Sequence, residues 1–197
     1  RRQRQMCIRD RITGTIGTEN GLANPKVLCM LEQKDGSILA GTDGNGIALI
    51  RNRKVVSHYK KTNGLSSGVV LRMVPDTDNG GIFVITSNSL CFMKKDQIRE
   101  LKNFPYYNNF DMVEGNKGEV FVLSSAGIYV VDKKKLENGE KLDYDLLNAT
   151  KGLQESLTPN AWNYIDENDN LYISGGFGAV YMNTVSYTHL TLPTKLE

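Results

Sequence analysis

The stretch NGLANPKVLCMLEQKDGSILAGTDGNGIALIRNRKVVSHY, from Asn20 to Tyr59, contains the unit that decides the fold. In it, short apolar runs alternate with Gly, Asn and Asp. Runs of about five residues that are rich in β-branched side chains and bounded by turn residues are typical of strands rather than helices. The unit therefore predicts four strands, with runs at 27–31, 38–40, 47–50 and 55–59. Four strands in about 40–45 residues is the size of one propeller blade.

The unit occurs four times along the chain. Its second strand reads GSILAGT, GGIFVIT, GEVFVLS and DNLYISG, starting at residues 36, 80, 118 and 169. The bulky fourth residue of these segments is Leu39, Phe83, Phe121 or Tyr172. A Gly-Leu pair precedes three of the units, and Phe104-Pro105 takes its place in the other. Because each unit exposes apolar faces that it cannot cover alone, neighbouring units must stack on one another.

These repeats predict an all-β protein: a β-propeller fragment with four-stranded blades, about three of them complete, plus partial ones. The propeller segment is expected over 12–183, with blades at about 18–61, 62–103, 104–150 and 151–183. Residues 12–17 (ITGTIG) are expected to be the outer strand of a preceding blade, because VVSHYKKT occupies that place before the next Asn-Gly-Leu. Since a propeller closes four to eight blades into a ring, the fragment is expected to have two unpaired blade faces.

The two ends of the chain have a separate origin. Back-translating RRQRQMCIRD, residues 1–10, as CGTCGGCAGCGTCAGATGTGTATAAGAGAC gives a segment whose reverse complement encodes VSYTHLTLPT, residues 185–194. One DNA segment therefore explains both ends, in opposite orientations, and it resembles the transposase adapter of short-read sequencing libraries. We expect residues 1–11 and 184–197 to be adapter-derived, and the segment between them to be a piece of a longer protein.

The adapter assignment changes the charge argument. Five Arg within residues 1–11 would otherwise suggest an arm that binds nucleic acid. Without the two ends, Lys and Arg fall from 24 to 18 and Asp and Glu from 22 to 20, so the net charge changes from +2 to −2. We therefore expect no nucleic-acid partner. No run approaches the ~18–20 apolar residues of a membrane span, and membrane contact is expected only through a missing downstream segment.

Several local patterns favour structural roles over metal or cofactor binding. Cys29 and Cys91 lie in apolar strand runs, as small buried hydrophobes do. Asp43-Gly44-Asn45-Gly46 resembles a calcium loop but lacks a bidentate Glu at the right distance, and the same residues suit a tight hairpin. The insertion KKKLENGEKLDYD, at 133–145, is expected to be a solvated excursion with one helical turn. No metal and no cofactor are expected.

A ligand site is expected at one mouth of the central channel, where the loops entering the inner strands meet the turns between the two middle strands. Aromatic faces and amides, which suit a sugar or another small polar ligand, are supplied there by Tyr106, Tyr107, Asn108, Asn160 and Trp162. The alternative is that Tyr and Trp fill space between blades.

Three polar residues, Arg72, Asp111 and Asn163, fall at one repeat position on the inner strands. Polar groups there need partners across blades or channel water, so structural pairing is expected rather than chemistry.

No catalytic residue is expected. Outside the adapter-derived ends the only His is His58, on an outer strand, and the sequence has no Gly-x-Ser-x-Gly, His-Glu-x-x-His or phosphate-loop motif. Carboxylates recur at strand ends, where solvated turn roles suffice for them: Glu32, Glu114 and Asp166.

Two long segments carry a resemblance to a known family. NGLANPKVLCMLEQKDGSILAGTDGNGI, at 20–47, and NGLSSGVVLRMVPDTDNGGIFVITSNSL, at 63–90, resemble the two-component regulator propeller repeat. In that family Asn-Gly-Leu leads into an inner strand, followed by Asp-Gly, an aromatic-centred strand, Gly-Thr and a Gly-rich turn. The chain departs from this pattern at the family's usual Trp, which is replaced by Leu39, Phe83, Phe121 and Tyr172.

The resemblance implies an extracytoplasmic sensor propeller of a bacterial transmembrane signalling protein, in the periplasm or at the cell surface. Such propellers precede a histidine kinase or a diguanylate cyclase, and neither output domain is in this sequence. We therefore expect a non-enzymatic domain that senses a ligand or partner. The full-length protein is expected to be anchored in the membrane, and a homodimer of it is a further possibility. The alternatives are a propeller lyase-type enzyme and a surface adhesion or scaffold propeller.

Overall fold

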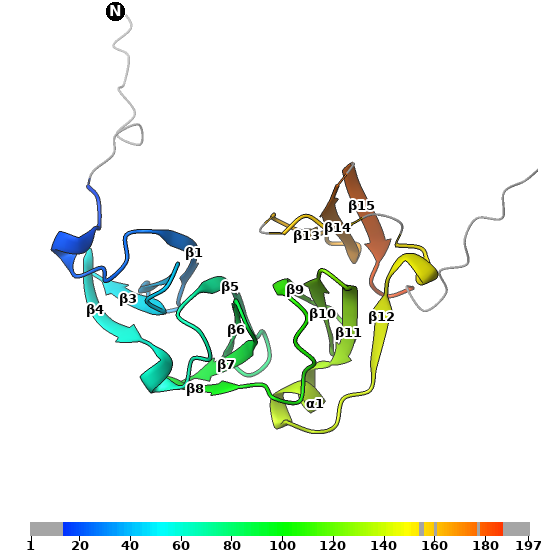
Figure 1. Ribbon diagram of the computed structural model, residues 1–197, viewed down its shortest axis with the longest axis horizontal. Coiled ribbons are helices and arrows are strands. Elements are labelled where there is room, and N and C mark those ends of the chain that lie inside the picture. The colour runs from blue at the N-terminus through cyan, green and yellow to red at the C-terminus, as the bar shows by residue number, and fades with distance from the viewer. Residues whose placement is uncertain (1–13, 154–155, 160, 177, 187–197) are drawn as a thin grey trace, which may run out of the picture.

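The computed structural model describes residues 14–153, 156–159, 161–176 and 178–186. They form four antiparallel sheets, in each of which the strands are hydrogen-bonded in chain order. The sheets follow one another around an arc, with β1, β5, β9 and β13 on its concave side (Figure 1). This is the arrangement expected of successive propeller blades, and the sheets are called blades 1 to 4 below.

The bounds of the strands are as follows. Blade 1 contains β1 (Val27–Glu32), β2 (Ile38–Thr42), β3 (Ile47–Arg51) and β4 (Lys54–Tyr59). Blade 2 contains β5 (Val70–Pro75), β6 (Ile82–Thr86), β7 (Leu90–Lys94) and β8 (Gln97–Glu100). Blade 3 contains β9 (Asn109–Glu114), β10 (Glu119–Ser124), β11 (Gly127–Asp132) and β12 (Tyr144–Leu147). Blade 4 contains β13 (Tyr164–Ile165), β14 (Asn170–Gly175) and β15 (Gly178–Asn183).

The hydrophobic core lies between the blades. The bulky fourth residue of each repeat faces the following blade: Leu39 clusters with Met73 and Val84 of blade 2, and Phe83 clusters with Met112 of blade 3. Phe121 packs in the same way towards blade 4. Burying one such side chain contributes about 1.5–3 kcal/mol, so each blade depends on its neighbours for stability.

The Asn-Gly-Leu signature forms the same turn each time. Thr18–Asn20 and Lys61–Asn63 are 3₁₀ turns, and the Asn side chain accepts a hydrogen bond from the backbone N–H three residues earlier, at 2.9 Å. The Gly that follows has a φ of 94° in the first turn and 102° in the second, a left-handed conformation that Gly adopts without a steric cost. Leu22 and Leu65 are then buried against the next blade.

Two further expectations are confirmed. Cys29 and Cys91 are free and buried. The turn after β2 is a hairpin turn, closed by the bond from the Thr42 N–H to the Gly46 carbonyl at 2.9 Å.

The expectation that the insertion at 133–145 is a solvated excursion is wrong for its first half. Lys133–Asn138 forms a helix, α1, and its Lys133 and Leu136 side chains are buried. The reason is that the Lys133 ammonium group finds carboxylate partners in blade 2, while Leu136 joins the core between blades 2 and 3.

Blade 4 also differs from expectation, because its inner strand, which was expected to contain Asn163, begins only at Tyr164. The preceding backbone contacts Arg72, through the carbonyl of Ala161, instead of continuing the ladder. Of the ends expected to be adapter-derived, the described part includes only 184–186, where the Thr184 N–H donates to the Asp169 carbonyl at 2.8 Å. Among the described residues, no helix is both long enough and apolar enough to cross a membrane.

Candidate functional site

The channel side of the arc carries a polar cluster built from three blades. Arg72 of β5 lies with its Nε 3.1 Å from Oδ1 of Asp111 on β9. Asn163, just before β13, donates from Nδ2 to the other carboxylate oxygen of Asp111 at 2.6 Å. Burial raises the pKa of Asp111, and the charge of Arg72 and the bond from Asn163 oppose that rise. The predicted structural pairing of these three residues is therefore confirmed.

Arg72 also fixes the predicted ligand residue Trp162. Its Nη2 donates to the Ala161 carbonyl at 2.6 Å, and its guanidinium carbon lies 4.3 Å from the centre of the Trp162 ring. This is a cation–π contact. Trp162 remains 79% exposed, so most of the indole is open to solvent while the guanidinium holds its position.

The other predicted residues gather at the turns between middle strands. The Tyr106 hydroxyl donates to the Ser87 carbonyl in the β6–β7 turn, and burial raises the pKa of Tyr106. The Ser125 hydroxyl, in the β10–β11 turn, donates to the Tyr107 carbonyl at 3.4 Å. Both tyrosine rings are exposed. The entry loop thus meets the middle turns as the sequence predicted.

Of the two remaining predicted residues, the structure describes Asn108 but not Asn160. Asn108 is exposed and has a φ of 50°, a left-handed conformation that Asn adopts more readily than most residues. Asn160 lies outside the described residues. The candidate site therefore consists of two groups, one around Trp162 and one at Tyr106–Asn108.

The sequence did not single out Asn109, the first residue of β9. Its side chain is completely buried, and neither Nδ2 nor Oδ1 has a hydrogen-bond partner among the described residues. Leaving a buried polar group unpaired costs about 1–3 kcal/mol, and native proteins rarely do so. The available signal was a second amide directly after Asn108, at the start of an inner-strand run.

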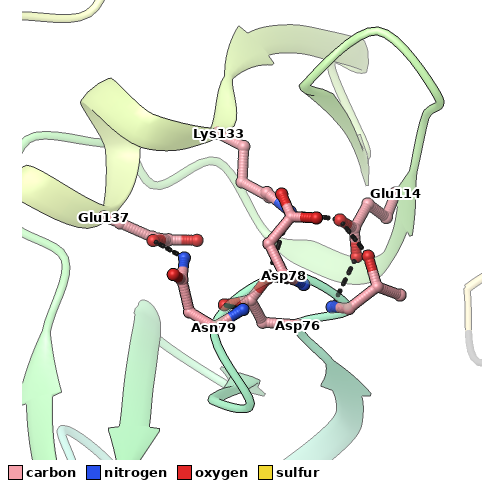
Figure 2. A network of polar contacts seen from close by, with 7 residues as sticks. Asp76, Asp78, Asn79, Glu114, Lys133 and Glu137 are labelled. Atoms are coloured by element: carbon pink, nitrogen blue, oxygen red, sulfur yellow. Dashed lines mark hydrogen bonds and ion pairs between the residues drawn. The ribbon is translucent and has the colours of Figure 1, made fainter.

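A second polar cluster joins blades 2 and 3 on the side of α1. Figure 2 shows the Lys133 side chain reaching from α1 towards carboxylates of the facing elements. Its Nζ lies 3.1 Å from Asp76 Oδ1 and 2.5 Å from Asp78 Oδ2, and it also bonds to Glu114. Asn79 donates from Nδ2 to Glu137 at 3.0 Å. Glu114 is thus not the solvated turn residue that the sequence suggested.

The three carboxylates of this cluster are close enough together to hold a metal ion, but the Lys133 ammonium group already lies between them. Burial works against ionisation of Asp76, yet the bonds from Lys133 and from the N–H groups of Asp78 and Asn79 lower the pKa of Asp76. Burial and the nearby Asp76 raise the pKa of Glu137. The cluster therefore acts as an ion-pair network that ties two blades together.

Comparisons with known proteins agree with this architecture. No family model matches the chain, and no curated protein matches it. Among solved structures, the extracellular domain of BT4673 from B. thetaiotaomicron, described as a one-component system, is 17% identical over 87% of this chain, with a TM-score of 0.67. The extracellular domain of BT3049, a hybrid two-component system of the same organism, is 20% identical over 85%, with a TM-score of 0.65.

A third solved structure is the C-terminal WD40 domain of Sif2, 10% identical over 79% of this chain and 44% of its own length, with a TM-score of 0.54. WD40 repeats build β-propellers. Together with the four blades in sequence, these likenesses define the class of protein: the chain is a fragment of an all-β propeller. It spans 22% of the length of the two B. thetaiotaomicron domains.

Proposed function

We propose that this chain is part of the extracytoplasmic sensing propeller of a bacterial transmembrane signalling protein, and that it binds a small polar ligand or a partner at the channel mouth. The chain resembles in fold the extracellular domains of two signalling systems, and the Asn-Gly-Leu repeats support the same class. In the full-length protein, a membrane-anchored histidine kinase or diguanylate cyclase would supply the output. The propeller fragment itself is non-enzymatic and has no nucleic-acid partner.

One observation carries the ligand part of the proposal. Two aromatic rings at the mouth are exposed but held in position by a polar contact. Trp162 packs against the Arg72 guanidinium group, and the Tyr106 hydroxyl donates to the Ser87 carbonyl. A ring that is already held loses little conformational entropy on binding. The exposed amide of Asn108 supplies a polar group next to the tyrosines in the chain. Aromatic faces combined with amides suit a carbohydrate.

The proposed mechanism is a shift between two orientations of the membrane-proximal part. A ligand changes such an equilibrium only by its difference in affinity for the two states. Arg72, Asp111 and Asn163 connect blades 2, 3 and 4 on the channel side. A ligand bound at the mouth would therefore act on all three blades together. A ligand there would favour one inter-blade arrangement, and this preference would reach the output domain.

The chain supplies its own probe for the test. Trp162 is the one Trp in the sequence, which also has nine Tyr, so fluorescence excited selectively at the indole reports from the candidate site alone. The protein would be titrated with a panel of neutral disaccharides and longer oligosaccharides, and hits would be repeated by calorimetry. We expect at least one saturable hit, weakened at least about tenfold by Tyr107→Ala. The control is Tyr144→Ala, an exposed tyrosine on the outer strand β12.

The proposal of a carbohydrate site fails if no member of the panel gives a saturable response in both methods. It also fails if Tyr107→Ala and Tyr144→Ala bind a hit equally well, because binding would then lie outside the mouth.

A further inference from the structure

A groove follows the outer side of blade 2, on the convex side of the arc where β8 and α1 lie (Figure 1). The β7–β8 hairpin lines one side of the groove, and α1, which follows β11 of blade 3, lines the other. The two sides are connected by the hydrogen bond from Arg99 Nη2 to the Glu137 carbonyl. The volume of the groove is about 1220 Å³, a size that suits a small molecule rather than a single ion.

The groove is separate from the candidate site at the channel mouth. Successive turns of an antiparallel sheet lie at opposite ends of its strands. The β7–β8 turn is therefore at the other end of blade 2 from the β6–β7 turn, which Tyr106 contacts. A ligand in the groove would be additional to any ligand at the mouth.

Cationic side chains outnumber carboxylates in the groove. Four cations line it, against two carboxylates: Lys94, Lys95, Arg99 and Lys134, and Asp96 and Glu137. Within the described part of the chain, none of these four cations takes part in an ion pair. Asp96 accepts a hydrogen bond from the Tyr59 hydroxyl of blade 1. The groove therefore has an excess of positive charge that no described carboxylate pairs with.

Two polar side chains of the groove are held in place. The guanidinium carbon of Arg99 lies 5.5 Å from the centre of the buried Phe92 ring. Figure 2 shows the Asn79 amide beside the Glu137 carboxylate, to which its Nδ2 donates at 3.0 Å. A guanidinium group has five N–H donors, and the contact with the Glu137 carbonyl uses one of them. A side chain fixed in this way loses little conformational entropy when it binds a ligand.

Lysines on an outer strand can also serve only to keep other strands away from its edge. That role would account for Lys94 and Lys95, at the turn between β7 and β8. It does not account for Lys134, which is exposed on a helix and has no strand edge to protect. Cations that converge from two elements of different blades are better explained by an anion between them.

We propose that this groove binds a small molecule that carries several anionic oxygen atoms, as phosphate or carboxylate groups. The lysines on both sides neutralise its charge, and Arg99 binds one of its groups with paired N–H donors, a geometry that guanidinium groups favour. Because the two sides belong to different blades, an occupied groove stabilises the contact between blades 2 and 3. The inference does not rest on the proposed function, since the groove contains no residue assigned to the channel mouth.

The test is isothermal titration calorimetry of the whole chain with inorganic triphosphate and with citrate, at low and at high salt. We expect one saturable binding event with at least one of them, and an affinity that falls as salt rises, because exposed charges are screened. Tighter binding of triphosphate would assign the site to phosphate groups, and tighter binding of citrate to carboxylate groups. The ligand that binds should also raise the midpoint of thermal unfolding.

A groove variant and a matched control locate the binding. The groove variant combines Lys94→Gln, Lys95→Asn and Lys134→Gln; Asn is chosen because Asn52 adopts the same left-handed conformation in the corresponding turn of blade 1. We expect its affinity to fall at least about tenfold, because three charge contacts are lost together. The control removes three exposed lysines of blade 1 that do not line the groove and should keep its affinity within about twofold: Lys34→Gln, Lys54→Gln and Lys60→Gln.

Two results would overturn the proposal. The first is no saturable binding of either anion at low salt by a chain that circular dichroism shows to be folded. The second is equal affinity in the groove variant and the control, because binding would then follow the net charge of the chain or lie outside the groove. Circular dichroism of both variants would verify that the six substitutions, all at exposed lysines, leave the fold intact.

Discussion

The guanidinium carbon of Arg72 lies 4.3 Å from the centre of the Trp162 ring, so that side chains of blades 2 and 4 meet on the channel side of blade 3. The same guanidinium group pairs with Asp111 of blade 3. One side chain therefore holds three successive blades, and the exposed indole of the candidate site is positioned by the contact that also fixes the spacing of the blades.

Replacing Arg72 with Met should destabilise the fold strongly. The change leaves the buried Asp111 carboxylate without its cation, and breaking a buried pair in this way costs about 3–5 kcal/mol. Urea unfolding would measure the loss. Arg51→Met is the control, because Arg51 pairs with Asp35 at the surface, where such pairs contribute about 0–1 kcal/mol. Equal losses in the two variants would contradict the role of Arg72.

Trp162→Ala should affect stability much less than Arg72→Met. The indole is exposed, and a cation–π contact at an exposed site contributes about 0.5–1 kcal/mol. The same unfolding experiment would show a shift of this size, while any ligand found by calorimetry should lose affinity. A stability loss as large as that of Arg72→Met would mean that Trp162 is a structural residue rather than a ligand contact.

Lys133→Met should lower stability near neutral pH by about 3–5 kcal/mol, because three carboxylates lose their shared cation. It should also reduce the acid sensitivity of the fold. The pKa of Asp76 is lowered in the folded state, so its contribution is present above the unfolded value of about 3.9 and is lost as pH falls through the folded value.

Urea midpoints measured from neutral pH down to about pH 2 would show this difference in acid sensitivity. Without Lys133 the pKa of Asp76 is lowered less in the folded state. The plot of urea midpoint against pH should therefore be flatter for Lys133→Met than for the wild type. Lys151→Met removes an exposed partner of Asp145 and should preserve the wild-type slope. A Lys133→Met curve parallel to that of the wild type would refute the coupling.

Two glycines with the same backbone conformation should respond differently to Ala. Gly36 and Gly46 both have a φ of 77°, and a left-handed residue with a Cβ costs about 1–2 kcal/mol. Gly36 has open space around it, whereas a Cβ on Gly46 would lie 2.0 Å from the Tyr59 carbonyl oxygen. Thermal unfolding should therefore show a larger loss for Gly46→Ala; similar losses would mean that the outer strand β4 moves aside easily.

The buried thiols should be unreactive in the native state. Burial raises the pKa of Cys29 to about 11, so almost none of it is thiolate, the reactive form, at pH 8. In a Cys7→Ser variant, a thiol reagent should react with neither Cys29 nor Cys91 before urea is added, and with both afterwards. Rapid reaction of one thiol in native buffer would show that a blade interface opens.

The fold was predictable because the repeat encodes it locally. Short apolar runs bounded by Gly, Asn and Asp specify the strands, so the strands could be predicted without knowing any contact between blades. The pairing of Arg72 with Asp111 was predictable for a related reason: equal repeat positions on adjacent inner strands must lie close together.

The Lys133 network could not be predicted, because two of its three partners, Asp76 and Asp78, come from a turn of another blade. In addition, nothing local marks a Lys in a charged insertion as buried. The same holds for Asn109, whose unpaired amide differs from an ordinary loop Asn only in its surroundings. The inner strand of blade 4 is shorter than its repeat pattern predicts, because the backbone before Tyr164 contacts Arg72 instead of extending the strand.

The side chain at the fourth position of the repeat changes in size along the chain, from Leu39 through Phe83 and Phe121 to Tyr172. Leu39 packs in the cluster of Met73 and Val84, and Phe83 packs in that of Met112 and Val122. A core at this density tolerates neither a lost nor an added ring cheaply. Blades whose fourth residues differ in size are therefore not interchangeable modules, and a recombination event that exchanged them would join mismatched surfaces.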